Sequence, residues 1–228
     1  MNVRKNVSNL IYKIDGVGVN LEKFYPVRSE EEKNVLRQSY NFSSDDFIVL
    51  YTAEFIPRKN HKLIFDILKA LKLEIPSLKM VFCGSGKLLE EYNFFATTNE
   101  MNDYVLFTGY TNNVDDYCRL ADVLVMPSLQ EGLPLALIEA MATGLPLVAS
   151  DIRGHRDVIL NYENGILCDL NNPKSFLGAI MLLYKNKSLR NEMKLRNIER
   201  AKLFSVDNAV VNMEKIYLQV IPPPYIIN

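Results

Sequence analysis

Residues 123–149 read VLVMPSLQEGLPLALIEAMATGLPLVA, and this stretch decides the fold of the chain. Its first four residues are apolar, as in a strand buried on both faces, and a proline ends that strand. A helix is predicted from about Leu133 to Thr143, with Gly132 as its cap, Pro134 in its first turn and Gly144 as its left-handed terminator. Because this helix is apolar on nearly every side, it is expected to be buried.

Glu139 is the one charged side chain of that helix between Leu133 and Ala142. A carboxylate on a buried helix needs a hydrogen-bonding partner, which is either a neighbouring Lys or Arg or the hydroxyls of a ligand in a pocket. Glu131 lies just before the helix, where exposed N–H groups attract anions, so on its own it is a dipole-compensating acid. At a rise of about 1.5 Å per residue, the two carboxylates would be about 10 Å apart. That separation suits a ligand with hydroxyls at both ends and phosphates between them.

Composition limits the partners of the chain. Its 228 residues hold 26 basic and 27 acidic side chains, so the net charge of −1 gives no reason to expect nucleic acid or an anionic membrane as a partner. No apolar run approaches the roughly 18 residues that span a bilayer. The three cysteines are scattered, without the paired spacing of a zinc site or a disulfide framework, and fit a reducing cytoplasm.

Strands and helices alternate along the chain. Strands are predicted at residues 47–51, 78–83, 105–107, 123–126, 145–150 and 165–168. Helices are predicted at residues 30–40, 61–73, 87–93, 114–120, 133–143, 154–160, 173–184, 188–203 and 206–220. Because parallel strands need crossovers, the pattern predicts an α/β fold with a Rossmann-like, doubly wound parallel sheet of about six strands. Such sheets bind ligands beyond the carboxyl ends of their strands, so the candidate loops are 52–60, 84–87, 108–112, 127–133 and 150–155.

The glycine pair in the second candidate loop, Gly84 and Gly86, begins like a dinucleotide-binding motif. The third glycine of that motif would fall at Leu89, so the pattern fails. A tight turn between strand and helix is the preferred interpretation, although two glycines also let a ligand approach the backbone.

Two adjacent cations, Arg58 and Lys59, follow the first predicted strand. Alone they would be solvated surface, and only the neighbouring glutamate loop favours them as phosphate ligands. His61 is predicted to start a helix, and His155 either contacts a ligand or lies on the surface. Neither histidine, nor the pair Asp115–Asp116, has metal-ligand spacing, so no metal site is expected.

The segment from Pro127 to Ser150 resembles the signature of the family 4 retaining glycosyltransferases, which have the GT-B architecture. Two glutamates eight residues apart, the glycine and proline between them, and the following Gly-Leu-Pro-Leu-Val segment carry the resemblance. It extends over about residues 10–220. Further matching motifs lie at residues 16–20 with Phe24, and at residues 59–60, 84–86, 107–109, 121–122 and 163–165.

The resemblance implies a role for each matching residue. Glu139 would accept hydrogen bonds from the ribose of a nucleotide, Glu131 would contact the donor sugar, and Lys59 would neutralise the leaving diphosphate, with Arg58 as a further donor-binding residue. The remaining donor-binding positions implied are Gly132, Leu133, Pro134, Gly84, Gly86, Gly109 and Tyr110. No cofactor is implied, and a UDP-sugar is expected as substrate in preference to a GDP-sugar.

Two positions depart from the family pattern. The arginine that usually shares the phosphate role falls at Glu54, as in a polysaccharide-forming branch that carries glutamate there. Asn20 replaces the usual aspartate of the hinge.

The resemblance also predicts the domain organisation. Residues 1–24 would be the hinge segment and residues 25–228 the C-terminal nucleotide-sugar-binding domain, one half of a GT-B fold, with the N-terminal acceptor domain absent. The expected function is retaining sugar transfer to a glycan or lipid-linked acceptor in surface polysaccharide synthesis, with a separate N-terminal domain chain as a partner. The expected location is the cytoplasm, at most peripheral to the inner face of the membrane. The alternatives are a non-catalytic nucleotide-sugar-binding or scaffold module and, with less support, a nucleotide-sugar epimerase.

Overall fold

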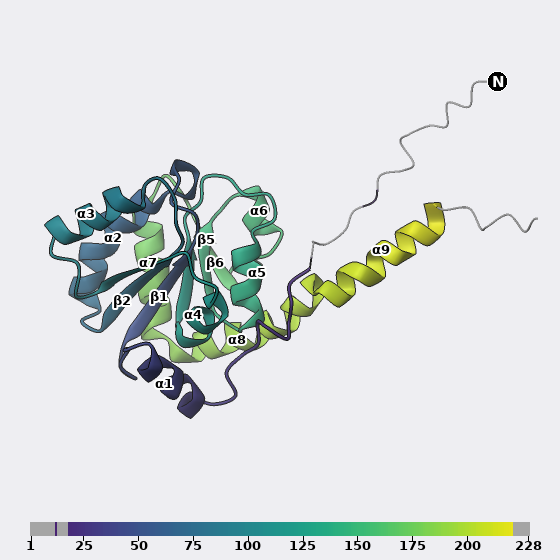
Figure 1. Ribbon diagram of the computed structural model, residues 1–228, viewed down its shortest axis with the longest axis horizontal. Helices are drawn as coiled ribbons and strands as arrows, with labels where there is room; N and C mark the ends of the chain where they lie inside the picture. The colour runs from purple at the N-terminus through teal and green to yellow at the C-terminus, as the bar shows by residue number, and fades with distance from the viewer. Residues whose placement is uncertain (1–11, 13–17, 221–228) are drawn as a thin grey trace, which may run out of the picture.

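A computed structural model describes residue 12 and residues 18–220 of the chain. In this part, six parallel strands form one sheet in the order β3-β2-β1-β4-β5-β6, which confirms the predicted doubly wound fold (Figure 1). The strands are β1 (Phe47–Thr52), β2 (Leu78–Cys83), β3 (Val105–Gly109), β4 (Val123–Met126), β5 (Leu147–Ser150) and β6 (Gly165–Cys168). The helices are α1 (Glu30–Ser39), α2 (His61–Glu74), α3 (Leu89–Thr98), α4 (Val114–Leu120), α5 (Leu135–Ala142), α6 (Arg153–Arg156), α7 (Pro173–Lys185), α8 (Lys187–Ala201) and α9 (Val206–Val220). Two short 3-10 helices lie at Pro57–Lys59 and Lys202–Phe204.

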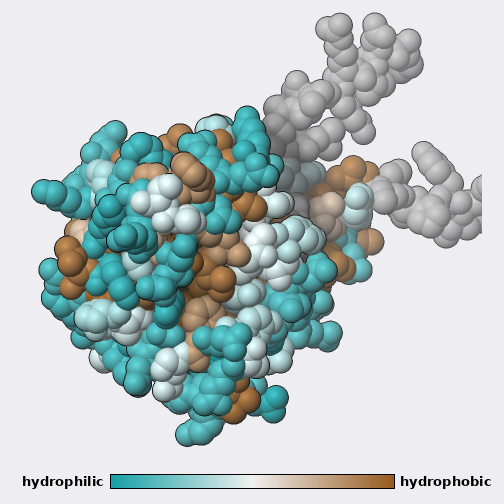
Figure 2. Space-filling view, turned by 60° about the vertical axis from the view of Figure 1, so that its left-hand side comes forward, coloured by the Kyte–Doolittle hydropathy of each residue, from teal (hydrophilic) through white to brown (hydrophobic). Residues whose placement is uncertain are grey.

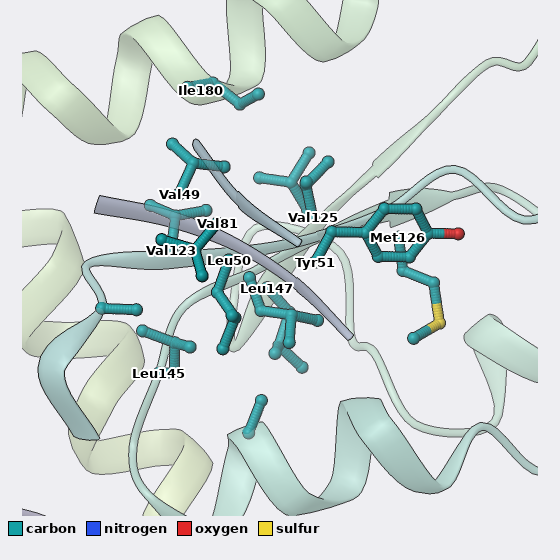
Figure 3. Close-up of a cluster of buried hydrophobic side chains, with 14 of the residues drawn as sticks. Val49, Leu50, Tyr51, Val81, Val123, Val125, Met126, Leu145, Leu147 and Ile180 are labelled. Atoms are coloured by element: carbon teal, nitrogen blue, oxygen red, sulfur yellow. The ribbon is translucent and has the colours of Figure 1, made fainter. Parts of the chain in front are cut away.

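Helices cover both faces of the sheet. Helices α2 and α7 pack together on one face, whereas α4 packs between α1 and α5 on the other, and α8 packs on α5 (Figure 1). Every residue of β1, β4 and β5 is buried, as expected for central strands of a parallel sheet. Figure 3 shows the alternation of side chains: Val49 lies on the side of Ile180 from α7, whereas Leu50 and Leu145 lie on the opposite side.

Asp122, directly before β4, joins α1 and the start of β1 through a buried polar network. One of its carboxylate oxygens accepts hydrogen bonds from Arg37 (2.7 Å) and from the backbone N–H of Ile48 (2.9 Å). The other oxygen accepts a hydrogen bond from the ammonium group of Lys33 at 2.9 Å. Although burial raises the pKa of Asp122, the charges of Lys33 and Arg37 lower it below its ordinary value. The network therefore fixes α1 and the start of β1 against the loop before β4.

His61 begins α2, as predicted, and belongs to an aromatic cluster. Its ring stacks on Phe55 with 4.1 Å between the ring centroids, and it lies 4.7 Å from the ring centroid of Tyr51. The residue is 1% exposed, and neither ring nitrogen has a hydrogen-bond partner among the described residues. Burial, with the nearby charge of Lys59, lowers the pKa of His61 to about 3. The imidazole is therefore neutral and behaves as an aromatic core residue.

Replacing His61 with phenylalanine is expected to reduce the acid sensitivity of the fold. The pKa of His61 is lower in the folded protein than the ordinary value of about 6.5. The neutral imidazole therefore contributes its full stability above about pH 6.5, and this contribution is lost as the pH falls below that value. Between pH 7 and pH 5 this loss amounts to about 2 kcal/mol, and His61→Phe should abolish it. Urea unfolding at both pH values measures the difference. An equally steep loss in the variant would contradict the prediction.

Helix α5 begins two residues later than predicted, at Leu135, and Pro134 rather than Gly132 is its N-cap. The reason is local, because a residue that precedes proline disfavours the helical conformation, and Leu133 precedes Pro134. The helix is also less buried than expected, since Leu135 is 44% exposed. The predicted left-handed terminator is confirmed, because Gly144 has a φ of +78°.

Other boundaries differ for similar reasons. Strand β5 begins at Leu147 rather than residue 145, because Pro146 has no N–H to donate to the ladder. Helix α3 begins at Leu89 rather than residue 87, following Gly86 with a φ of +146°. Helix α6 is a single turn that ends at Arg156, short of the predicted residue 160.

The described part of the predicted hinge segment, residues 18–24, packs on the domain. Val19 and Phe24 are buried in the same core as the sheet. The N–H of Val19 donates to the carbonyl of Phe204 at 2.8 Å, and Val206 donates back to Val19 at 3.1 Å. Residues 1–11 and 13–17 of the predicted hinge segment, including the first two residues of the motif at residues 16–20, lie outside the described residues.

Helix α9 projects away from the body of the domain (Figure 1). None of its residues is buried, although it carries several apolar side chains. Figure 2 shows apolar residues, drawn in brown, on the part of α9 beside the grey terminal segments. The most exposed apolar side chains of the helix are Val210 (50%), Tyr217 (54%) and Leu218 (82%). This helix therefore presents an apolar surface that the other described residues of the domain do not cover.

Candidate functional site

The loops after β1 and β4 meet where the order of the strands reverses. These strands are neighbours in the sheet, although about 70 residues separate them in sequence. The N–H of Leu129 donates to the carbonyl of Arg58 at 2.9 Å, and the side-chain amide of Asn60 donates to the carbonyl of Pro127 at 3.2 Å. The two loops therefore form one connected unit beyond the carboxyl ends of the strands, as the candidate-loop prediction required.

An ion-pair cluster joins the predicted residues Arg58, Lys59 and Glu131. The ammonium group of Lys59 lies 2.5 Å from one carboxylate oxygen of Glu131, and the guanidinium group of Arg58 lies 3.4 Å from the other. Arg58 also donates to the carbonyl of Gln130 at 2.8 Å. The Lys59 and Glu131 side chains are only 16% and 8% exposed, whereas that of Arg58 is 44% exposed. The cluster thus holds two cations beside one carboxylate at the edge of the sheet.

The charge state of Glu131 follows from this cluster. Burial raises the pKa of its carboxyl group, but the hydrogen bond and charge of Lys59 and the charge of Arg58 outweigh burial and lower it below the ordinary value. Glu131 is therefore ionised at neutral pH. One negative and two positive charges leave a net positive site, which favours an anion.

The turn at Glu131 and Gly132 lies between the ion-pair cluster and the start of α5. Among the described residues, the N–H groups of Gly132 and Leu133 have no acceptor. Gly154, at the start of α6, packs against this turn: a Cβ atom there would lie 2.3 Å from the carbonyl oxygen of Gly132 and 2.6 Å from that of Glu131. Only glycine at position 154 therefore lets the start of α6 pack directly against the backbone of this turn.

His155, the residue after Gly154, is fully buried, so the interpretation that it lies on the surface is wrong. Its Nδ1 atom lies 2.8 Å from the carbonyl oxygen of Ser150, which can only accept, so Nδ1 carries a proton. Burial lowers the pKa of His155, and the neutral ring leaves Nε2 without a partner among the described residues. The ring therefore ties α6 to the end of β5.

Glu139 is the acidic residue for which a partner was expected. Among the described residues, its carboxylate forms no hydrogen bond and no ion pair, so the salt-bridge interpretation finds no support there. Burial raises its pKa, and the charge of Asp115 raises it further, whereas the charge of Lys23 lowers it. Lys23 itself donates to the carbonyl of Asn112 at 3.1 Å. Glu139 is thus a partly buried acceptor that the described protein leaves available for a ligand.

The glycine positions at the other strand ends have structural explanations. A Cβ atom on Gly84 would lie 2.0 Å from the carbonyl oxygen of Ala53, and one on Gly86 would lie 2.7 Å from the backbone of Phe55. Both glycines therefore let the β2 loop pack on the β1 loop, as the tight-turn interpretation predicts. Gly109 has a φ of +67° with open space around its Cβ position, and Tyr110 beside it is 77% exposed.

The structure connects only some of the predicted residues directly. Arg58, Lys59 and Glu131 contact one another, whereas no hydrogen bond or ion pair among the described residues links them to Glu139 or Tyr110. Glu54, which stands at the usual arginine position, is exposed and takes no part in the cluster.

Residues 18–220 were also searched for metal-binding clusters and for membrane-spanning helices. In this range, no three His, Cys, Asp or Glu side chains gather as they would around a metal ion. Asp115 and Asp116 instead form ion pairs with Arg119. No helix described in the structure combines the length and apolar character needed to cross a membrane.

The sequence of the chain is similar to those of known proteins. The sequence profile of the glycosyl transferases group 1 matches residues 32–200. The chain is 37% identical over 205 residues to EpsD of Bacillus subtilis, which is named as a glycosyltransferase, covering 90% of this chain and 54% of that protein. It is 27% identical over 207 residues to the UDP-Gal:alpha-D-GlcNAc-diphosphoundecaprenol alpha-1,3-galactosyltransferase of Escherichia coli, covering 90% of this chain and 53% of that protein.

A solved structure shares the fold. The crystal structure of HepE from Anabaena in complex with UDP superposes with a TM-score of 0.79 at 18% identity, covering 90% of this chain and 56% of that one. The chain spans about half the length of the curated relatives that it matches. Because the family profile matches well over half of its 228 residues, the chain belongs to the glycosyl transferases of group 1.

Proposed function

We propose that this domain binds the nucleotide-sugar donor of a retaining glycosyltransferase in surface polysaccharide synthesis. The observation that supports this most is the pairing of Lys59 and Arg58 with Glu131 at the switch point of the sheet. Two cations next to free backbone N–H groups suit a diphosphate. Glu139, without a partner among the described residues, suits the hydroxyls of a ribose.

In the proposed complex each residue has a distinct role. The N–H groups of Gly132 and Leu133, with Lys59, bind the diphosphate, and Glu131 contacts the sugar. Lys59 stabilises the negative charge that develops on the leaving diphosphate as the sugar departs with oxocarbenium character. Gly84, Gly86, Gly109, Pro134 and Tyr110 complete the wall on the nucleotide side. No metal or cofactor takes part.

We propose UDP as the nucleotide of the donor. The Escherichia coli relative is named as using UDP-Gal, and the HepE structure contains UDP. Calorimetry with UDP and GDP tests this directly, and tighter binding of UDP is expected. No binding of either nucleotide at millimolar concentration would overturn the proposed function, and tighter binding of GDP would overturn the choice of base.

Replacing Lys59 with methionine is expected to weaken UDP binding about tenfold, since one charge-assisted hydrogen bond contributes about 1.5 kcal/mol or more. Methionine keeps an unbranched apolar side chain and removes the charge. Lys62→Met is the matched control, because Lys62 is a 73% exposed lysine of α2 that, in the described part of the chain, pairs only with Asp66. Calorimetry with UDP measures both variants, and equal affinities for the two would contradict the role of Lys59.

We propose further that transfer needs an acceptor-binding half outside this domain, which acts on a glycan or lipid-linked acceptor. The curated relatives are about twice as long as this chain, and helix α9 carries an apolar surface that this domain leaves uncovered. Mixing the chain with a candidate acceptor domain and assaying sugar transfer tests the proposal. Donor binding without transfer in any such mixture would favour the non-catalytic binding module instead.

A further inference from the structure

Lys59 lies at the end of a short loop that is held by hydrogen bonds at three consecutive residues. The carbonyl of Arg58 accepts a hydrogen bond from Leu129 at 2.9 Å. The carbonyl of Lys59 accepts a hydrogen bond from the hydroxyl of Tyr51. The side-chain amide of Asn60 donates to the carbonyl of Pro127 at 3.2 Å. The first and third contacts join the loop to the segment that carries Glu131, and the second joins it to the sheet.

Tyr51 is a core residue whose hydroxyl forms a hydrogen bond. It is fully buried in β1, and its ring packs between the sheet and the aromatic cluster around His61. Figure 3 shows its oxygen, drawn in red, at the end of the ring farthest from the strand. A hydroxyl in such a place is costly unless it is hydrogen-bonded, and its acceptor is the carbonyl of Lys59.

Asn60 combines two properties that few residues share. Its backbone is left-handed, with a φ of 52°, which non-glycine residues other than Asn and Asp seldom adopt. Glycine would allow the same turn but could not donate to Pro127. The asparagine therefore reverses the chain directly after Lys59 and also attaches that turn to the loop from β4.

We propose that Tyr51 and Asn60 are positioning residues for diphosphate binding: they hold the backbone of Lys59 so that its ammonium group stays at the Glu131 cluster. A lysine has a long flexible side chain, and its charge can be kept at one place at lower entropic cost if its backbone is already fixed. The inference rests on the proposed function and extends it to residues that do not touch the ligand.

The test compares two ligands that differ by one phosphate. Tyr51→Phe and Asn60→Gly should each weaken UDP binding about five- to tenfold, the size of one net hydrogen bond. Binding of UMP, which lacks the second phosphate, should change by less than about twofold in both variants. In a Lys59→Met background, neither substitution should weaken UDP binding further, since the group they position is gone.

Matched controls come from the amino ends of the strands, opposite to the carboxyl ends at which the site lies. Tyr104→Phe removes the hydroxyl of a tyrosine that is 9% exposed, and Asn41→Gly replaces another left-handed asparagine, with a φ of 61°. Both should leave UDP binding unchanged. Circular dichroism and thermal unfolding confirm that each variant is folded, and if Tyr51→Phe fails to fold, Asn60→Gly carries the test.

The outcomes separate this inference from the function on which it rests. UDP binding that is unchanged in both variants, or lost equally with UMP binding, or lost further in the Lys59→Met background, overturns the positioning role while the proposed function stands. An unmodified chain that binds no nucleotide overturns the proposed function and this inference with it.

Discussion

Replacing Asp122 with alanine is expected to lower the free energy of unfolding by about 3–5 kcal/mol, because it leaves two buried cations without their counter-charge. Arg37 is 5% exposed in its side chain and Lys33 is 14% exposed, so solvent cannot replace the carboxylate. The N–H of Ile48 at the start of β1 also loses its acceptor. Urea unfolding at pH 7 measures the loss.

The matched control is a second aspartate–arginine pair on the surface. Asp151 lies 2.6 Å from Arg156, a distance like that of the buried pair, but the two side chains are 45% and 59% exposed. Asp151→Ala should therefore cost less than about 1 kcal/mol. If the two variants lost similar stability, the buried network would not be what secures α1 to the sheet.

Replacing Glu139 with glutamine is expected to weaken nucleotide binding by about 1–3 kcal/mol, through the loss of charged hydrogen bonds to the ribose. The same change should raise the thermal unfolding temperature at pH 7. Burial raises the pKa of Glu139, so the folded protein holds this proton more tightly than the unfolded chain does. The free energy of unfolding therefore decreases as the pH rises above the ordinary pKa of a glutamate, because Glu139 must then be ionised in the folded protein. Glutamine stays neutral and avoids that loss.

The pH dependence of binding distinguishes this role from a structural one. UDP binding by the unmodified chain should weaken on acidification as Glu139 takes up a proton, whereas the glutamine variant should lack this component. Glu90→Gln, an exposed change on α3, serves as the control. Affinity that is unchanged by Glu139→Gln, together with unchanged pH dependence, would exclude the ribose role.

Much of the fold could be predicted because its strands are short apolar runs bounded by turn residues. The limits of β2, β4 and β6 agree with the prediction. Errors occurred where a proline acts on the residue before it or on the ladder, as at Leu133 and Pro146. The extent of burial of α5 was also overestimated, because periodicity cannot show which part of an apolar helix faces a site.

The charged residues of the candidate site could be predicted from the sequence, but the residues that hold them in place could not. Lys59, Arg58 and Glu131 stand out by type and by their places after strands. Asn60 stood in a matching motif beside Lys59, but its left-handed backbone and its bond to Pro127 depend on the tertiary structure. Tyr51 reads as an ordinary strand residue, and Gly154 reads as the first residue of a predicted helix. No local signal marks either one.

The separation of Lys59 and Glu131 in the sequence has a consequence for folding. The pair joins residues 72 positions apart, and two further βα units, β2–α3 and β3–α4, lie in the sequence between the first unit and β4. Contacts of such long range form late, because the entropy of closing the loop must be paid before they stabilise the chain. Nucleotide binding would then be a measure of the pairing of β1 with β4. A nascent chain that ends before β4 would contain Lys59 but not the segment with Glu131 that its loop contacts.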